Sequence, residues 1–584
     1  MNYILKNIRK DSLMETILSN RKIEDVQRVL NPDNSSDTDT SKITSIEQGI
    51  NLIKQNLNNG RILILIDSDV DGMTSGAIMY KYLKMINKYS QLSYYFHNGK
   101  QHGITEEFMN FLVNNEFDLI IIPDAGTNDL ENIEKIKMLY GTDILIIDHH
   151  PVIDKISEYA ITINNQLCEY TNSNLTGAGL TYLFCKEMNK QYQIDEFDEL
   201  LDLALVGQVG DCSNLVENEV RNMCFSSLKN IKNKFMTAIY NECGKDITNL
   251  SITDLSFGGI IPLINSVMRI GTAENKEIVF RALADMDDGK TWVVTKRKLN
   301  KITRKYEMID FTMDIYQYAN EICTTTRNKQ NKISNTVMGI LEKEFNVNSN
   351  IQIYTIDFSK KEFGKLNPWE IKGVSGLIAN KLADKFGKPT IVSWYDEETE
   401  SYIGSLRGNE RVLENFKEWC LNTGLFEFVS GHNNAAGVSF KKESLNSIIK
   451  EAEKIEATGI CYEVDYIFGD LNSSDIYEVD KYKNLWINGV EEPLFAYEDI
   501  NISTNMIQWS KNTMRIYYGG VTLIKFRISE EEIQEIKDKG PYITMRFVGT
   551  TNINEWAGKK YPQIMIKDFE VIDKKDCIDY GIFG

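Results

Sequence analysis

Short apolar runs that alternate with helical stretches dominate residues 46–290. The segments Arg61–Ile66, Leu119–Ile122 and Ile144–Ile147 are nearly continuous in apolar residues, which is typical of strands buried on both faces. After the first of them, Met73–Leu83 has apolar residues at helical spacing. Strands that alternate with helices predict an α/β domain with a largely parallel sheet.

The pattern changes along the chain and divides it into five regions. Residues 1–45 are predicted to be a helical lead-in that ends in a polar linker, and residues 46–290 form the parallel-sheet domain. Residues 291–349 have no strand signal and are predicted to be a long connecting helix. Residues 350–455 form a second α/β domain, in which IQIYTID and PTIVSWY are strands, and residues 460–584 are β-rich.

The β-rich region has short alternating strands in RIYYGGVTLIKFRI, YITMRFVG and YPQIMIKDFEVI, separated by glycine or polar turns. This pattern fits a small barrel of the oligonucleotide-binding type. Aromatic residues such as Tyr517, Phe526 and Phe547 could stack on bases, although alternation turns about half of such side chains into the core.

A basic run opens the predicted connecting helix. It contains Lys290, Lys296, Arg297, Lys298, Lys301, Arg304 and Lys305, without an acidic residue between 290 and 306. Two interpretations remain open, a solvated helix face and a surface that faces nucleic acid.

Composition restricts the class of protein. The apolar content of 42% suffices for packed cores, and the apolar runs are too short for a transmembrane helix. The start, MNYILKNIRKDSL, has no signal-peptide segment, and the nine dispersed cysteines form no CxxC pair. We therefore expect a cytoplasmic, multidomain protein with reduced thiols. The net charge of −19 disfavours non-specific binding to duplex DNA, but local basic grooves can act within an acidic shell.

Acidic residues follow the first strand at alternate positions. Asp67, Asp69 and Asp71 would share one face of an extended segment, where three carboxylates repel one another unless a cation neutralises them. Gly72 then ends the extended segment and the helical stretch begins.

Three more apolar segments, each expected to be a strand, end in the same way. Asp124 follows the second strand, ahead of a turn at Gly126, and Asp211 follows the segment LALVGQVG. The third strand ends in Asp148, His149 and His150. Any one of these would be a capping or turn residue, but four together predict a site at the carboxyl edge of the sheet. Carboxylate and imidazole together suit a first-row metal better than calcium.

The segments IDSDVDGMTS, PDAGTND, IDHH and VGQVGD, in this order, resemble the four motifs of the DHH phosphoesterase superfamily. Over nearly its whole length the chain is similar to the RecJ-type single-strand exonucleases. The segments GVSGLIANKLADKFGKPTIV, GSLRG and SGHNNAAG resemble the DHHA1 domain of that family. The resemblance implies a DHH domain, a DHHA1 domain and a terminal oligonucleotide-binding fold.

The resemblance also implies a two-metal site that holds Mn²⁺ or Mg²⁺, and the imidazoles favour Mn²⁺. The implied ligands are Asp67, Asp69, Asp71, Asp124, His149 and Asp211. His150 is implied as a further ligand or a transition-state donor, and Asp148 as the carboxylate that orients the histidines.

The chain departs from the family pattern in three places. Leu65 stands where some superfamily members have histidine, and Ala125 replaces a polar residue. HNGKQHG at 97–103 matches a family loop only loosely, so His97 and His102 are interpreted as loop histidines.

Five residues are candidates for binding the nucleic acid. The resemblance implies that Asn265 and Arg269 lie near it, and that Arg269 meets the 5′ phosphate. In the DHHA1 domain, Arg407 could hold a phosphate bidentately beside Ser405, and small residues around His432 would allow close backbone approach.

The resemblance implies a monomeric, metal-dependent exonuclease that degrades single-stranded DNA from 5′ to 3′ and releases 5′-mononucleotides. The resemblance leaves open whether a single-strand-binding protein or a helicase is a partner. Three alternatives remain. One is a phosphodiesterase that acts on short oligonucleotides or cyclic dinucleotides, although such enzymes are generally shorter. The others are an inactive replication-associated relative, which would have lost metal ligands, and a pyrophosphatase, which would lack the terminal domain.

Overall fold

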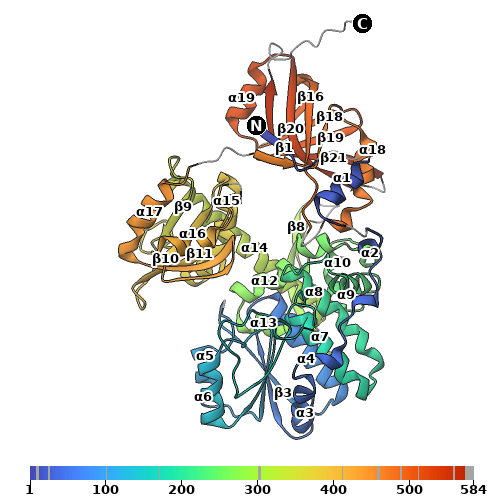
Figure 1. The fold of residues 1–584 in the computed structure, drawn as a ribbon, viewed down its shortest axis with the longest axis vertical. Coiled ribbons are helices and arrows are strands. Elements are labelled where there is room, and N and C mark those ends of the chain that lie inside the picture. The colour runs from blue at the N-terminus through green and yellow to red at the C-terminus, as the bar shows by residue number, and fades with distance from the viewer. Residues whose placement is uncertain are drawn as a thin grey trace. The chain divides into compact units, whose positions relative to one another are not determined.

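The computed structural model describes residues 1–7, 12–23, 26–99, 101–169, 171–299, 304–410, 412–456, 461–486, 490–510, 512–556 and 559–572. The chain divides into two compact units (Figure 1). One, which we call the catalytic unit, is Pro32–Glu456, and the other, the terminal unit, joins Met1–Asn31 to Ala457–Gly584.

The first half of the catalytic unit is built on a five-stranded parallel sheet, as the apolar runs predict. Its strand order is β3-β2-β4-β5-β6. The strands are β2 (Arg61–Ile66), β3 (Gln91–Phe96), β4 (Leu119–Pro123), β5 (Asp143–Asp148) and β6 (Ile161–Asn164). Because β3 lies on one side of β2 and β4 on the other, the chain reverses direction across the sheet at β2.

Helices cover both faces of this sheet (Figure 1). On one face lie α5 (Glu106–Leu112) and α6 (Leu130–Tyr140), which bury Phe108 and Ile133 in a cluster with the strand residues Leu65 and Ile146. On the other lie α3 (Ile46–Asn56), α4 (Val70–Ile86) and α7 (Gly177–Tyr192). Apolar side chains on both faces explain why these strands have continuous apolar sequences.

A helical layer follows the sheet. It consists of α8 (Leu201–Gly210), α9 (Asn218–Leu228), α10 (Lys234–Glu242), α11 (Ile252–Ser256), α12 (Ile260–Ile270) and α13 (Ala273–Leu283). The prediction that the apolar segment before Asp211 is a strand is wrong, because residues 201–210 form α8. A fully buried helix also has an unbroken apolar sequence, so apolar content alone could not distinguish the two.

The prediction of a helix throughout 291–349 is wrong for its first part. Strands β7 (Trp292–Leu299) and β8 (Tyr306–Met313) pair antiparallel there, and Lys301 lies outside the described residues. Helix α14 (Ile315–Leu341) then begins behind Asp314, whose carboxylate caps Gln317 N while the Gln317 side chain accepts from Asp314 N. This capping box ends the strand and starts the helix.

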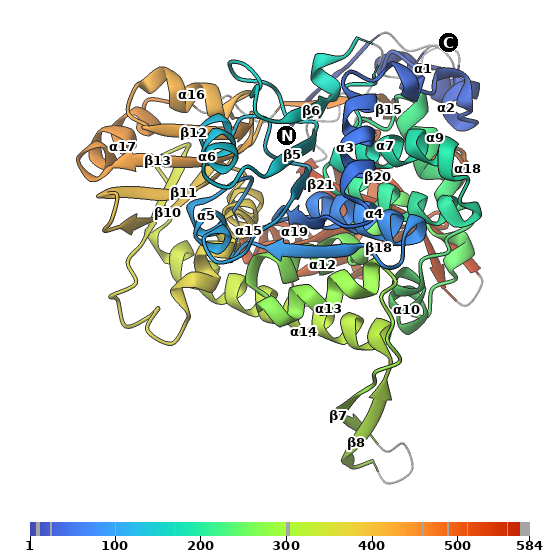
Figure 2. The ribbon, with the colours of Figure 1, turned by 90° about the horizontal axis from the view of Figure 1, so that it is seen from below.

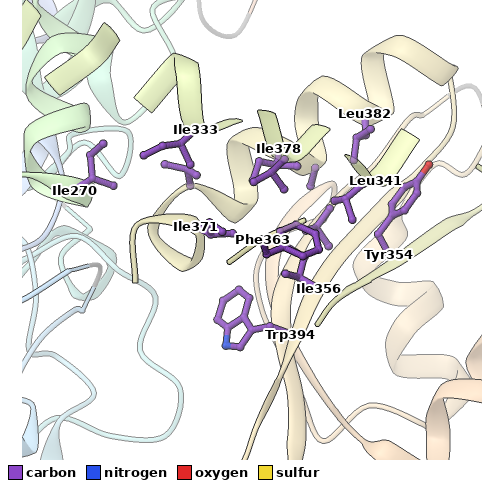
Figure 3. Packing of buried hydrophobic residues seen from close by; sticks show 14 residues of the cluster. Ile270, Ile333, Leu341, Tyr354, Ile356, Phe363, Ile371, Ile378, Leu382 and Trp394 are labelled. Atoms are coloured by element: carbon purple, nitrogen blue, oxygen red, sulfur yellow. The ribbon is translucent and has the colours of Figure 1, made fainter. Parts of the chain in front are cut away.

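The second α/β domain has a sheet of order β12-β13-β11-β10-β9. Its strands are β9 (Gln352–Ile356), β10 (Thr390–Asp396), β11 (Ser401–Arg407), β12 (Phe428–His432) and β13 (Ala435–Lys441), and its helices are α15 (Pro368–Phe386), α16 (Phe416–Thr423) and α17 (Leu445–Glu453). Figure 3 shows Ile371 and Ile378 of α15 packed near Ile333 of α14, in a cluster that also includes Ile270 of α12. This shared core fixes the second domain against the helices of the first.

The terminal unit contains a seven-stranded mixed sheet of order β15-β16-β20-β21-β19-β18-β17. The strands are β15 (Tyr466–Phe468), β16 (Phe495–Ser503), β17 (Ile507–Ser510), β18 (Thr513–Tyr518), β19 (Val521–Phe526), β20 (Tyr542–Trp556) and β21 (Lys559–Ile572), with helices α18 (Ser473–Asp480) and α19 (Glu530–Asp538). Phe547 is buried in this sheet, whereas Tyr517 and Phe526 are exposed.

The first residues of the chain are only partly helical, so the prediction of a helical lead-in is wrong for its start. Strand β1 (Asn2–Leu5) pairs in parallel with β14 (Cys461–Val464), and α1 (Leu13–Asn20) and α2 (Val26–Leu30) follow. The described cysteines are all free thiols, as expected. Within the described part of the chain, none of the helices is long and apolar enough to span a membrane.

Candidate metal centre and nucleic-acid site

The reversal of strand order at β2 creates a crevice position at the carboxyl ends of β2 and β4. Open α/β sheets bind their ligands at such a position, because the loops there diverge to opposite sides. Asp67 follows β2, Asp124 follows β4, and His149 follows the neighbouring strand β5. The predicted strand-end residues therefore meet at one edge of the sheet.

The three acids after β2 lie in a different local structure from the one predicted. Asp69 is the N-cap of α4, and its Oδ1 accepts from Asp71 N at 3.0 Å and Gly72 N at 3.1 Å. The helix thus begins at Val70, and Asp71 lies in its first turn rather than on an extended segment. Capping by Asp69 explains why the helix begins at Val70, two residues before Gly72, where the sequence pattern ends the extended segment.

The N-terminus of α7 fixes Asp71. Its carboxylate accepts from Thr176 Oγ1 at 2.9 Å, Gly177 N at 2.8 Å and Ala178 N at 3.0 Å. Backbone N–H groups at a helix start stabilise an anion. Burial nevertheless raises the pKa of Asp71.

Asp124 is a buried carboxylate in a strained conformation. Its φ is +70°, in the left-handed region that aspartate tolerates better than most residues. Among the described residues, its buried Oδ1 accepts no hydrogen bond of good geometry, and a Cβ on Gly177 would stand 2.4 Å from that atom. Burial, followed by the charge of Asp71, raises the pKa of Asp124 well above its usual range. A buried carboxylate oxygen without a well-formed hydrogen bond, next to a histidine, is a position where a cation could bind.

His149 lies at the centre of the site. Its Nε2 is 3.2 Å from Asp124 Oδ1, 3.7 Å from Asp211 Oδ2 and 3.8 Å from Asp71 Oδ2. Burial lowers the pKa of His149, which favours the neutral imidazole that binds metals. Asp211 reaches this point from the C-terminal end of α8, and burial, followed by the charge of Asp71, raises its pKa to about 7.

Asp148 and His150 form a charged pair beside this centre. Asp148 accepts from the backbone N–H groups of His149 at 2.8 Å and Thr127 at 3.0 Å, and from His150 Nδ1 at 2.7 Å. Although burial opposes it, the bond to His150 lowers the pKa of Asp148 to about 2. The same bond raises the pKa of His150 to about 9. The pair is therefore ionised at neutral pH.

His102 was interpreted as a loop residue, but the structure brings it into the site. Its Nδ1 is 2.6 Å from Asp67 Oδ2, and Gly103 N donates to the other oxygen of Asp67 at 3.1 Å. The loop is fixed from behind, because the buried Lys276 of α13 donates to the carbonyl of His97. The loose match of HNGKQHG to a family loop was the only signal in the sequence.

Three donor groups could each hold a metal ion. They are Asp67, Asp69 and His102; Asp71, His149 and Asp211; and Asp124, His149 and His150. Within each group the ligand atoms lie within 4.8 Å of one another. Mixed carboxylate and imidazole donors, together with the buried Asp124 Oδ1, fit a divalent first-row ion.

Two of the three departures from the family motifs, Leu65 and Ala125, lie in the hydrophobic core rather than at the site. Leu65 is the last residue but one of β2 and Ala125 follows Asp124, and both belong to the buried cluster under α5 and α6. The position expected to lack a ligand therefore faces the core, and His102 supplies an imidazole from another loop.

The structure also gathers basic residues next to the metal centre. Arg269 lies near the end of α12, where the negative charge of Asp69 and the positive charge of Arg327 on α14 both act on it. Burial and the nearby charge of Arg269 lower the pKa of Arg407, at the end of β11, to about 10. Two guanidinium groups whose charges repel each other favour an anion between or beside them.

The other predicted substrate residues are divided between this cluster and the surface. Ser405 Oγ lies 3.0 Å from Ser375 Oγ of α15. Asn265 Oδ1, one helical turn before Arg269, is buried without a hydrogen-bond partner within the described ranges. His432, on strand β12 at the edge of the sheet, is exposed. Arg327 was missed, because nothing in its helical sequence distinguishes it from a surface residue.

Comparisons with known proteins agree with this geometry. The model of the DHH family, N-terminal domain, matches residues 61–208. The chain is 32% identical over 583 residues to a protein of the SPbeta prophage of Bacillus subtilis, provisionally named a single-strand DNA-specific exonuclease, and the match covers 96% of both chains. It is 24% identical to the single-stranded-DNA-specific exonuclease RecJ of Bacillus subtilis, over 91% of this chain and 64% of that protein.

The fold is also similar to a solved structure, that of RecJ from Thermus thermophilus in complex with Mn²⁺. The TM-score is 0.68 at 14% identity, over 96% of this chain and 76% of that one. The match supports the predicted order of a DHH domain, a DHHA1 domain and an oligonucleotide-binding-like sheet. The chain belongs to the DHH phosphoesterase superfamily, as one of its RecJ-type exonucleases.

Proposed function

We propose that the protein degrades single-stranded DNA from the 5′ end and releases 5′-mononucleotides, using two divalent ions. One observation carries the proposal. Arg269 lies within electrostatic reach of both Asp69, in the metal centre, and Arg407, in the second domain. A terminal phosphate held by these guanidinium groups would lie at a fixed distance from the metal ligands, and such a fixed distance makes an enzyme exonucleolytic.

The donor groups suggest how two ions would be held. Asp67, Asp69 and His102 would hold one, and Asp71, His149 and Asp211 the other. Asp124 lies 3.2 Å from His149 of the second group, and the charges of Asp67 and Asp69 act on it. When bound, a pair of divalent ions lowers the pKa of a bridging water and stabilises the attacking and leaving oxygens of a phosphodiester. Mn²⁺ suits the imidazole ligands better than Mg²⁺ does.

The remaining residues bind the substrate and donate hydrogen bonds to it. Because Asp148 accepts from Nδ1 of His150 and keeps the ring charged, the Nε2–H of His150 can donate to a phosphate oxygen as negative charge develops there. Arg269 and Arg407 would bind the terminal phosphate, and the paired hydroxyls of Ser375 and Ser405 would donate hydrogen bonds to its oxygens.

The test is digestion of four substrates in parallel with Mn²⁺: a 5′-labelled single strand, a dinucleotide, a cyclic dinucleotide and pyrophosphate. We expect the single strand to be degraded to mononucleotides from its 5′ end, EDTA to stop the reaction, and a blunt duplex of the same sequence to resist. Preferred hydrolysis of a cyclic dinucleotide or pyrophosphate, or equal degradation of the duplex, would contradict the proposal.

Arg407→Ala tests end recognition separately. It should lower kcat/KM on 5′-phosphorylated strands by roughly 1.5–3 kcal/mol, the size of a lost charge-assisted hydrogen bond. It should leave kcat nearly unchanged, because Arg407 is not among the metal-ligand groups. Arg407→Lys keeps the charge without the bidentate fork and should give an intermediate loss. If Arg407→Ala still distinguishes 5′-phosphate from 5′-hydroxyl ends as wild type does, Arg407 does not bind the phosphate.

A further inference from the structure

We propose that strands β7 and β8, which we call the β7–β8 ribbon (residues 292–299 and 306–313), form a second binding surface for single-stranded DNA. This inference rests on the proposed function, because it concerns a part of the same substrate that lies beyond the catalytic centre. The evidence is the ribbon's isolation from the sheets, the exposure of one of its faces, and its charge.

The ribbon is a separate element with a fixed base. Its two strands pair only with each other among the described strands, and Figure 2 shows them extending away from the helices. At the base, Trp292 stacks on Tyr318 of α14, with ring centres 4.9 Å apart, and Lys296 pairs with Glu321 of the same helix. A two-stranded ribbon is marginally stable alone, so these contacts hold it as an arm on α14.

The two faces of the ribbon differ. The register sets Arg297 opposite Met308 and Leu299 opposite Tyr306, and alternation adds Val293 to the same face. On this face Val293 is 66% exposed, Met308 67%, Tyr306 59% and Leu299 45%. Trp292 and Lys296, which contact α14, alternate onto the other face. Exposed apolar side chains gathered on one face indicate a partner.

The charge of the ribbon, taken together with the residues that flank it, favours a polyanion as that partner. The described residues between 290 and 313 include six basic and two acidic side chains, in a chain whose net charge is −19. The ribbon itself holds Lys296, Arg297 and Lys298 and both acidic residues, Glu307 and Asp310, and the other three basic residues flank it. A local basic excess on an otherwise acidic molecule is typical of a surface that binds nucleic acid.

The Arg297–Tyr306 pair favours a single strand over a duplex. The guanidinium carbon of Arg297 lies 4.2 Å from the ring centre of Tyr306. An exposed aromatic ring beside a cation is a platform on which an unpaired base stacks while the cation meets the phosphate. The bases of a duplex are already stacked on one another and cannot use such a ring.

The position of the ribbon predicts that its effect depends on substrate length. The ribbon joins the start of α14, whereas Arg327, whose charge acts on Arg269, lies 12 residues into that helix, about 18 Å away at 1.5 Å per residue. Tyr306 lies a further seven residues along the strand from the base of the ribbon at Met313, about 23 Å at 3.3 Å per residue, so a trinucleotide bound at Arg269 would not reach it.

The test compares the double variant Arg297→Ala/Tyr306→Ala with a matched control, Lys88→Ala/Tyr89→Ala. Lys88 and Tyr89 are another cation–ring pair, with Nζ 5.0 Å from the ring centre and Tyr89 79% exposed, at the amino end of β3. Binding of a strand of about 40 nucleotides is measured by fluorescence anisotropy in EDTA at several salt concentrations. Turnover of that strand and of a trinucleotide is measured with Mn²⁺.

We expect the ribbon variant to bind the long strand about ten-fold more weakly, as after loss of one base stack, with a shallower salt dependence. Its KM for the long strand should rise similarly, while trinucleotide turnover and the control variant remain like wild type. The proposal would be overturned if the ribbon variant bound the long strand as wild type does, or if turnover of the long strand and of the trinucleotide fell equally. It would also be overturned if the variant changed only the self-association of the protein. If wild type fails to degrade single strands, the proposed function fails, but the anisotropy comparison still decides for or against the ribbon.

Discussion

At the scale of single residues, the centre is built from carboxylates that the fold holds close together before any cation is bound. Asp71, Asp124 and Asp211 all lie around His149, and each has a raised pKa because burial and like charges oppose ionisation. Ionising these buried carboxylates therefore lowers the free energy of unfolding, and a bound cation would offset that cost. Substitutions here should affect stability and activity in opposite directions.

Asp124→Asn should show this most clearly, because asparagine has the same shape and also tolerates positive φ. We expect the rate of hydrolysis to fall by at least about 100-fold. Substituting a residue that only hydrogen-bonds to a metal ligand typically lowers activity about 10–100-fold. In EDTA the variant should melt at a higher temperature than wild type, because each unit of raised pKa represents about 1.4 kcal/mol. Activity assays and scanning calorimetry measure the two effects. A lower melting temperature in EDTA would contradict the strain argument.

Asp211 should make the stability of the metal-free protein depend on pH. Its pKa is about 7 in the folded protein, against an ordinary value of 3.8, so the folded state keeps a proton that the unfolded state has lost. Stability from this group is therefore present below about pH 4 and is lost as pH rises to about 7. Melting temperatures of wild type and Asp211→Asn in EDTA, between about pH 4 and 8, should diverge as pH rises, the variant being the more stable at high pH. A constant difference would show that Asp211 is not the group responsible.

At the scale of elements, glycines allow helices to approach the ligands. Gly207 of α8 faces α4 and α7 so closely that a Cβ would lie 2.4 Å from Asp71 Oδ1 and 2.4 Å from Ala178 Cβ. Gly177 has the same function beside Asp124. The ligands are thus placed by helix packing as well as by the strands that they follow.

Gly207→Ala should therefore destabilise the catalytic unit by about 1–3 kcal/mol, the usual cost of overpacking, and reduce activity by moving Asp71. The control is Gly339→Ala in α14, where a Cβ would meet nothing within 4 Å. That change should stabilise the protein by about 0.5–1 kcal/mol, since glycine weakens a helix interior. Chemical denaturation measures both changes. Equal effects of the two substitutions would refute close packing at Gly207.

At the scale of the whole molecule, the start of the chain belongs to the terminal unit rather than to the catalytic unit that follows it. Arg21 and Asp465 form a bidentate ion pair at 2.7 and 3.0 Å, with side chains 5% and 0% exposed. Asn20 and Leu494 N also donate to Asp465. Residues more than 400 positions apart are thereby joined within one unit.

Arg21→Met should leave Asp465 charged and buried, which costs about 3–5 kcal/mol. Hydrogen exchange should increase in residues 461–572 and remain unchanged in residues 32–456, and Mn²⁺ affinity should not change. Lys6→Met, which removes the more exposed pair with Glu491, should cost no more than about 1 kcal/mol. Increased exchange throughout the catalytic unit would show that the two units are not independent.

The sequence by itself determined the parallel sheet and most of its chemistry. Apolar strands buried on both faces have continuous apolar sequences, and polar residues directly after them must lie at the carboxyl edge. Asp67, Asp124 and His149 could therefore be assigned to one site from the apolar pattern alone. The order of the motifs added the family, and with it Arg269 and Arg407 as candidates.

Only the tertiary structure decided which distant groups complete the site. Thr176 contacts Asp71 across 105 positions, and His102 contacts Asp67 across 35. Neither contact leaves a local pattern, because strand order and helix packing create it. Asp211 arrives from a buried helix that has the same apolar composition as a strand. The β7–β8 ribbon was mistaken for helix because, with no core behind it, nothing imposes a clear period on its sequence. A hydrophobic pattern reflects the burial of each residue. It therefore cannot predict the structure of an exposed element or contacts between side chains that are distant in the sequence.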